Sequence, residues 1–314
     1  MALVHPITDE DAVLKIQEDV NKINKGIEDL GLCLNANKWK FQIISLRKST
    51  EDTNVQFSLN NTLLQRVGIL RYLGNEIDEN LWFTEHTHKV SIKEKRAIGE
   101  LSRNLKKWAP KYVFNEVYLK IAFPIFLYAI EVWCPASVSD QQRLERIIKF
   151  AASLSLNNFN RETSNEEILN KLKWKTSSRQ VAERRLLVMK KYMDGRRFIP
   201  ESVFPLETET SERSSERLTA QRNREHLLLR TFNDHKNKLE EKLSGAKMRK
   251  LWNSLLDDEI KLTFRLYKNL IISDEFYNRL CEKGLVNPIV VWDMWCVCSF
   301  PPSFLYFTFI CAAR

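Results

Sequence analysis

The chain has 314 residues, of which 44% are hydrophobic and 28% are charged, a composition typical of folded globular proteins that excludes global disorder. Only 8 residues are glycine, and no spacing among them forms the signature of a Rossmann dinucleotide site, a P-loop or a nucleophile elbow. The formal net charge is +9, and the excess is clustered: residues 89–120 hold nine basic and three acidic side chains, and residues 171–197 hold ten and two. Clustered positive charge predicts a polyanionic partner, most often a nucleic acid, although lysine-rich solvated helix faces would give the same pattern.

The cysteines form no metal-binding or redox motif. They lie at positions 33, 134, 281, 296, 298 and 311, without a C-x-x-C pair or a zinc-site spacing. We therefore expect reduced thiols in an intracellular protein of the cytoplasm or nucleus. The first thirty residues are acidic and periodic, which argues against a signal peptide.

Helical periodicity is clearest over residues 9–30. The apolar side chains recur at spacings of three and four residues, which places them on one face of a helix. Thr8 is a suitable N-cap, and Gly31 stands where a glycine commonly ends a helix. The segment predicts an amphipathic helix with one buried face.

Extended structure is predicted after this helix. Residues 39–44 are typical of a strand, and Asn60-Asn61 between two alternating segments predicts a hairpin with a two-residue turn. Residues 69–77 add a further extended segment through Tyr72-Leu73-Gly74.

From about residue 87 the periodicity is helical. Helices are predicted before and after Pro110, near 139–156 and near 177–193, and Pro124 is expected to bend the second of them. A short helix is expected after the capping-box spacing at 163–166.

The C-terminal third contains two segments of unusual composition. Nine of the ten residues 207–216 are Glu, Ser or Thr, which predicts a linker, and helices are expected again after it. Residues 289–313 hold one charged residue, Asp293, and the pair Pro301-Pro302. Three interpretations of this tail stay open: a membrane anchor, packing against the preceding helices, and an extension without a role.

Several short motifs follow one another over residues 1–260. In chain order they are 31–38 (GLCLNANK), 72–78 (YLGNEID), 81–86 (LWFTEH), 124–133 (PIFLYAIEVW), 144–146 (LER), 168–174 (ILNKLKW) and 251–255 (LWNSL). Their order and spacing resemble the reverse transcriptases of LINE-type, non-long-terminal-repeat retrotransposons. Ala129 stands where that family usually has glycine, and Leu256 where it has proline.

The resemblance implies an α+β fold that is mostly α. It predicts a small antiparallel palm remnant (1–80) and a helical thumb or connection (81–200). Composition adds an acidic Ser/Thr linker (201–217), after which we expect a C-terminal helical region (218–284) and an apolar tail (285–314). The resemblance stops near residue 284. The family's enzymes are RNA-directed DNA polymerases, whose palm holds two Mg²⁺ ions with three carboxylates. Two of these carboxylates belong to an aromatic-Ala-Asp-Asp hairpin, which the resemblance places just before Met1. We therefore expect no catalytic residue, metal ligand or cofactor in this chain, and no polymerisation by the chain alone.

The resemblance also implies roles for individual residues. Gly31, Asn35 and Lys38 correspond to positions near the incoming triphosphate, and Tyr72, Leu73 and Gly74 to the primer grip. The residues expected to contact nucleic-acid phosphates are Lys93, Arg96, Arg103, Lys106, Lys107, Arg184, Arg185, Lys190 and Lys191. The aromatic residues that interleave with them, expected to pack in the core, are Trp108, Tyr112, Trp133 and Trp174.

The expected partner is an RNA or DNA duplex or single strand, bound without sequence preference. No small-molecule substrate is expected. Asp293 and Pro301-Pro302 argue against a membrane span in the tail, and tethering through residues 289–313 is the less favoured hypothesis. Two alternatives stay open: a nucleic-acid-binding helical module without an enzymatic role, and an unselected, decaying transposon fragment.

Overall fold

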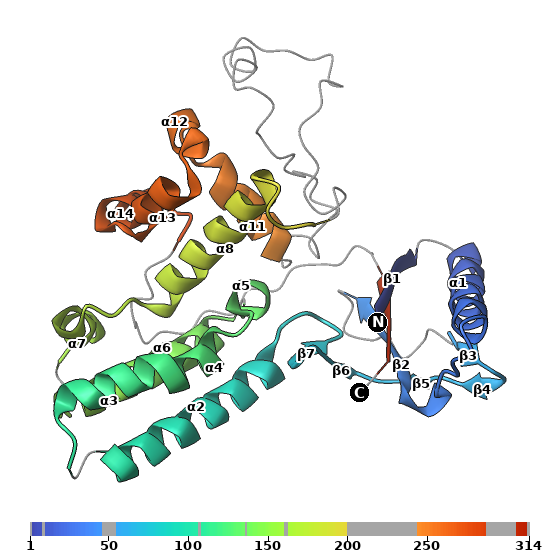
Figure 1. Cartoon of the computed structure of the whole chain (residues 1–314), viewed down its shortest axis with the longest axis horizontal. Helices are drawn as coiled ribbons and strands as arrows, with labels where there is room; N and C mark the ends of the chain where they lie inside the picture. The colour runs from blue at the N-terminus through green and yellow to red at the C-terminus, as the bar shows by residue number, and fades with distance from the viewer. Residues whose placement is uncertain are drawn as a thin grey trace. The chain divides into compact units, whose positions relative to one another are not determined.

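The chain forms two compact units. The computed structural model describes residues 2–7, 10–45, 55–105, 108–135, 137–159, 163–199, 244–286 and 306–312. Of these, unit 1 comprises 2–86 and 306–312, and unit 2 comprises 87–286 (Figure 1). The fold is α+β and mostly α, as the sequence predicted.

Unit 1 contains a four-stranded mixed sheet in the order β1-β8-β2-β5. Both β1 (Ala2–Ile7) and β2 (Trp39–Ser45) are antiparallel to β8 (Tyr306–Ala312), while β5 (Gln65–Arg66) is parallel to β2. The C-terminal strand therefore lies inside a sheet whose other strands come from the beginning of the chain. This part of the tail pairs with strands rather than with the preceding helices; residues 287–305 lie outside the described part.

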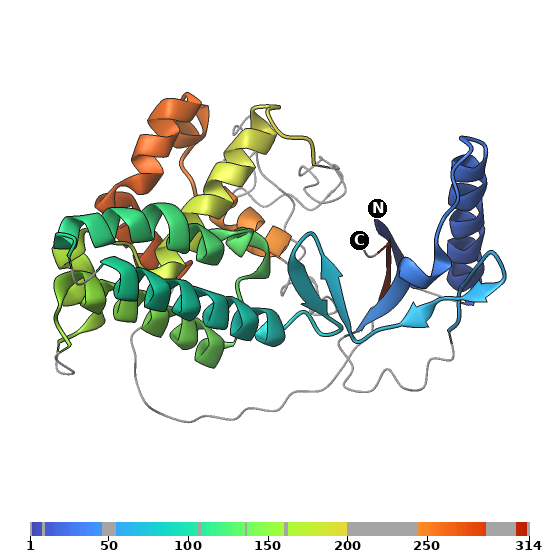
Figure 2. The ribbon, with the colours of Figure 1, turned by 60° about the horizontal axis from the view of Figure 1, so that its bottom comes forward.

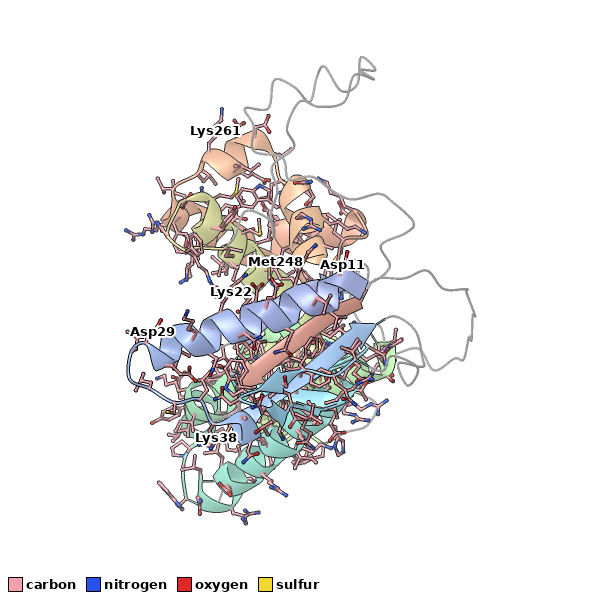
Figure 3. All side chains as sticks on the ribbon, turned by 90° about the vertical axis from the view of Figure 1, so that its right-hand side faces the viewer. Asp11, Lys22, Asp29, Lys38, Met248 and Lys261 are labelled. Atoms are coloured by element: carbon pink, nitrogen blue, oxygen red, sulfur yellow. The ribbon has the colours of Figure 1, made fainter. Side chains whose placement is uncertain are left out.

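The predicted N-terminal helix is α1 (Glu10–Glu28). Figure 3 shows it lying across the sheet, with Asp11 near its start and Asp29 just past its end. Ile16 and Val20 are buried against the sheet. Gly31 has φ 73°, and its N–H donates to the carbonyl of Glu28 at 2.8 Å, so the predicted C-terminal glycine is confirmed. Thr8, the predicted N-cap, lies outside the described residues.

Two hairpins follow in unit 1. The predicted turn at Asn60-Asn61 joins β3 (Ser58–Leu59) to β4 (Thr62–Leu63), and both asparagines have positive φ (51° and 60°), as a type I′ turn requires. The second hairpin pairs β6 (Ile69–Tyr72) with β7 (Asn75–Asp78).

Unit 2 is built from helices. Here α2 (Thr84–Leu105), which begins in unit 1, α3 (Lys111–Val117) and α6 (Val138–Leu156) run side by side (Figure 2). The expected bend near Pro124 is present: a π-helical turn, Tyr118–Ala122, leads into α4 (Phe123–Leu127). The remaining helices are α5 (Ile130–Trp133), α7 (Asn165–Leu172), α8 (Ser177–Met193), α11 (Ser244–Asn253), α12 (Asp257–Lys261), α13 (Phe264–Ile272) and α14 (Asp274–Glu282).

The helices on either side of the expected linker share one core. Leu186 and Met189 of α8 are buried with Trp252 of α11, Tyr267 of α13 and Leu280 of α14. The segment 244–286 therefore packs on α8 rather than forming a core of its own. Among the described helices, none combines the length and apolar composition needed to cross a bilayer.

Candidate nucleic-acid interface

The predicted primer-grip residues lie at the tip of the β6–β7 hairpin. Tyr72 ends β6, and Leu73 and Gly74 form the two-residue turn with φ of 47° and 85°. Leucine is unfavourable in the left-handed region by about 1–2 kcal/mol. Leu73 nevertheless adopts this conformation with 70% of its surface exposed, so an apolar side chain is presented at the hairpin tip.

Asp78 and His86 tie this hairpin to the start of α2. The carboxylate of Asp78 accepts hydrogen bonds from the backbone N–H groups of Asn80, Trp82 and Phe83 at 3.1, 2.9 and 2.5 Å. The Nδ1 atom of the buried His86 accepts a hydrogen bond from the backbone N–H of Glu76 at 3.2 Å. The motifs 72–78 and 81–86, separate in the sequence, thus form one connected junction.

Helix α2 carries a basic stripe along its exposed face. We define the basic stripe as Lys89, Lys93, Arg96 and Arg103, whose spacings of four, three and seven residues place them on one side of a helix. All four side chains are exposed, and Glu100 lies in the same row. Lys93, Arg96 and Arg103 form no ion pair with any described residue, so their charges are available to an external anion. Lys89 was not among the predicted contacts; the helical spacing alone identifies it.

The opposite face of α2 fixes the helix in unit 2. Val90 and Ile98 are buried, and Glu94 between them is fully buried as well. Burial raises the pKa of Glu94 from its usual value near 4.5 to about 7. Burial and the adjacent Glu94 also raise the pKa of Tyr118. With one face buried and the other charged, α2 presents the basic stripe on a rigid support.

Of the four aromatic residues expected to pack in the core, two do so and two are exposed. Trp133 is fully buried, and Trp174 stacks on Tyr118 at 4.9 Å between ring centroids, so these two pack as expected. The expectation is wrong for Trp108 and Tyr112, which are 74% and 70% exposed in and after the α2–α3 connection. The sequence pattern did not reveal this, because α2 ends at Leu105 and Trp108 does not belong to its buried face. Exposed aromatic rings beside basic residues are suited to stacking on nucleic-acid bases.

The predicted phosphate contacts on α8 lie in different environments. Lys190 is buried. Its ammonium group donates to the carbonyl of Ile260 at 2.8 Å and pairs with Asp194 at 2.9 Å, so its contacts are with other residues of unit 2. Arg184 lies 3.8 Å from a carboxylate oxygen of Glu131. Arg185 is buried and Lys191 is exposed. The residues of α8 therefore do not form a single basic face, and Lys106 and Lys107 lie outside the described residues.

The residues predicted near a triphosphate all lie between α1 and β2. Gly31 ends α1, and Asn35 caps the 3₁₀ helix Ala36–Lys38 by accepting the N–H of Asn37 at 3.1 Å. Lys38 is exposed at the end of that turn (Figure 3). Gly31 and Asn35 thus have a structural role whether or not a nucleotide binds.

No cluster of three or more metal-binding side chains occurs among the described residues. The expected absence of a metal ion or cofactor from this chain stays a prediction. Comparison of the chain with protein-family models, with curated proteins and with solved structures gave no match. The resemblance to LINE-type reverse transcriptases therefore rests on the residues themselves.

Proposed function

We propose that the chain binds the backbone of a nucleic-acid duplex through α2, as the part of a LINE-type reverse transcriptase that grips the primer and the template–primer duplex. The basic stripe carries the proposal. Lys89 and Arg103 are fourteen residues apart in the helix, which corresponds to about 21 Å along its axis. A row of this length matches several successive phosphates of a duplex, which carries one charge per about 1.7 Å of axis.

The stripe predicts binding without sequence preference. Lysine and arginine side chains that contact phosphates fix the position of a duplex but read no base. Trp108 and Tyr112 add stacking surfaces near the end of α2 that tolerate any base.

The structural roles of the motif residues support the relation to the reverse transcriptase family. Ala129, which stands where the family usually has glycine, has φ 52°. This is the left-handed region that favours glycine, so the backbone explains the family's preference at this position. Tyr72, Leu73 and Gly74 form an exposed hairpin tip, which is the geometry that the primer-grip role requires.

Fluorescence anisotropy tests the proposal directly. The full chain is titrated into labelled duplexes of two unrelated sequences at low salt, and we expect equal affinity for both. The variant Lys93→Gln/Arg96→Gln/Arg103→Gln should bind at least about tenfold more weakly, since each charged contact contributes on the order of 1 kcal/mol. The matched control, Lys15→Gln/Lys25→Gln/Lys268→Gln, removes three exposed cations from α1 and α13 and should bind almost as the wild type does.

Two results would reject the proposal: no binding at low salt, or undiminished binding by the α2 variant. Absence of binding would favour an unselected fragment. Undiminished binding by the variant would indicate that the duplex contacts a surface other than α2.

A further inference from the structure

A second basic region lies inside unit 2, in a pocket between α8 and α11. The pocket has a volume of about 310 Å³, near the lower end of the range of small-molecule sites. Its polar wall includes Gln141, Ser178, Arg185, Lys247 and Lys250. The described lining residues include three cations and no carboxylate. The carboxyl groups of Glu131 and Glu145 act on Arg185 and Cys134 from behind the wall, so the cations remain in excess among the groups at the pocket.

Arg185 places a buried, incompletely hydrogen-bonded guanidinium group at this pocket. Its side chain is only 7% exposed, yet its Nη2 atom has no hydrogen-bond partner among the described residues. The Nε atom donates to the backbone carbonyl of Glu131 at 3.1 Å, which fixes the guanidinium group at the pocket wall. A buried guanidinium with an unpaired N–H group is costly, because that group has lost water without gaining an acceptor. An anion in the pocket would supply the acceptor.

The two lysines add to this charge from α11. Met248 and Leu251 of α11 are buried against Ala182 and Leu186 of α8, and this packing holds the neighbouring Lys247 and Lys250 at the pocket. Neither lysine pairs with a carboxylate in the described part of the chain. Burial and the positive charge of Arg185 both lower the pKa of Lys247. The cations therefore repel one another, and a bound anion would relieve the repulsion.

We propose that this pocket binds a phosphate group, held by Arg185, Lys247 and Lys250. The guanidinium fork matches phosphate oxygens, and lysine binds phosphate as a point charge. Three cations without an acidic neighbour in the lining favour a multiply charged phosphate over a singly charged carboxylate. The volume of about 310 Å³ exceeds that of a single phosphate and leaves room for a second one, and the apolar residues Val181, Leu251 and Val286 would suit an attached organic group.

Isothermal titration calorimetry of the full chain with inorganic pyrophosphate tests the proposal. The wild type should bind, and Lys247→Gln and Lys250→Gln should each weaken binding by about tenfold or more, the loss expected for one charged hydrogen bond. Lys268→Gln, an exposed lysine of α13 outside the pocket, should leave the affinity unchanged. Both pocket variants keep Arg185, so the internal bond to Glu131 stays intact.

Cys134 provides a readout located at the pocket itself. Its thiol belongs to the lining, and burial raises its pKa. Bound pyrophosphate should slow alkylation of Cys134 in the wild type but not in Lys247→Gln, whereas the exposed Cys33 should react at the same rate throughout. Peptide mass spectrometry measures both rates.

The phosphate group could belong to a free small molecule or to the end of a nucleic acid. Oligonucleotides that carry either a 5′ phosphate or a 5′ hydroxyl distinguish these sources. If only the phosphorylated form protects Cys134, the pocket binds a strand end; if neither form does but pyrophosphate does, it binds a free phosphate compound.

The proposal is overturned if pyrophosphate does not bind the wild type, or binds Lys247→Gln equally well. Duplex binding through α2 does not depend on this result, because the pocket variants retain the basic stripe.

Discussion

The carboxylate of Glu145 in α6 accepts two hydrogen bonds from Ser177, the first residue of α8. The backbone N–H donates at 2.7 Å and the hydroxyl group at 2.5 Å. Both residues are buried, and burial raises the pKa of Glu145. This contact joins α6 to the N-terminus of α8, where a negative charge also interacts favourably with the helix dipole.

Ser177→Ala should lower the free energy of unfolding by about 1–3 kcal/mol, because a buried carboxylate loses one of its donors. Chemical denaturation at neutral pH measures the change. Ser102→Ala on α2, where the serine side chain makes no hydrogen bond to a described residue, should change stability by less than about 0.5 kcal/mol. Equal stability of the two variants would mean that the hydrogen bond from the Ser177 hydroxyl group to Glu145 contributes nothing.

Glu94 should make unit 2 less stable as the pH rises. Its pKa is about 7 in the folded chain and near 4.5 when unfolded, so folding favours the protonated carboxyl. The stability that this group contributes is fully present below pH 4.5 and is lost as the pH rises through 7, by on the order of 3 kcal/mol.

In Glu94→Gln this loss cannot occur. The Tm of the variant minus that of the wild type should therefore increase by several degrees between pH 4.5 and pH 8. Glu100→Gln, an exposed residue of the same helix, should show no such trend. Parallel pH profiles for wild type and Glu94→Gln would contradict the burial of an ionisable carboxyl at this position.

Ala129→Gly should stabilise unit 2. At φ 52° a Cβ atom is unfavourable, and glycine removes that strain, for a gain of about 1 kcal/mol. Ala152→Gly within α6 should have the opposite effect, since glycine weakens a helix interior and a buried methyl group is lost. Thermal unfolding of the two variants gives the signs, and destabilisation by Ala129→Gly would mean that the turn needs the alanine side chain.

Deletion of residues 306–314 should open the sheet of unit 1. Since β8 lies between β1 and β2, the deletion removes the strand that pairs with β1 and leaves β2 paired only with the two-residue β5. Hydrogen exchange of β2 amides should accelerate by more than about tenfold, while exchange in α6 of unit 2 should stay unchanged. Deletion of residues 313 and 314 alone is the control. Unchanged protection of β2 would show that β8 does not hold this sheet together.

Local chemistry predicted much of the fold. The positive φ of Gly31, Asn60 and Asn61 follows from what glycine and asparagine tolerate, so the end of α1 and the first hairpin could be placed from the sequence. Lys93, Arg96 and Arg103 were predicted from the charge cluster and the resemblance, and their common face on α2 follows from the period of the helix.

Long-range packing was beyond the sequence pattern. Nothing in residues 306–312 indicates that they pair with strands almost three hundred residues earlier. The resemblance implied that Lys190 and Arg185 contact phosphates, yet α8 is covered by α11 and α13, and both side chains are buried. The pocket beside Arg185 likewise forms only when α11 packs on α8, so the local sequence could not reveal it.

The salt dependence of duplex binding distinguishes phosphate contacts made by α2 from binding elsewhere on the chain. Each phosphate neutralised by the protein lowers log K by about 0.7–0.9 for each tenfold rise in salt. If Lys93, Arg96 and Arg103 contact phosphates, the negative slope of log K against log salt should be shallower, by about 2–3, for the triple α2 variant than for the wild type. The three-residue control on α1 and α13 should keep the wild-type slope. Coincident slopes for the wild type and the α2 variant would show that the basic stripe does not contact the nucleic acid.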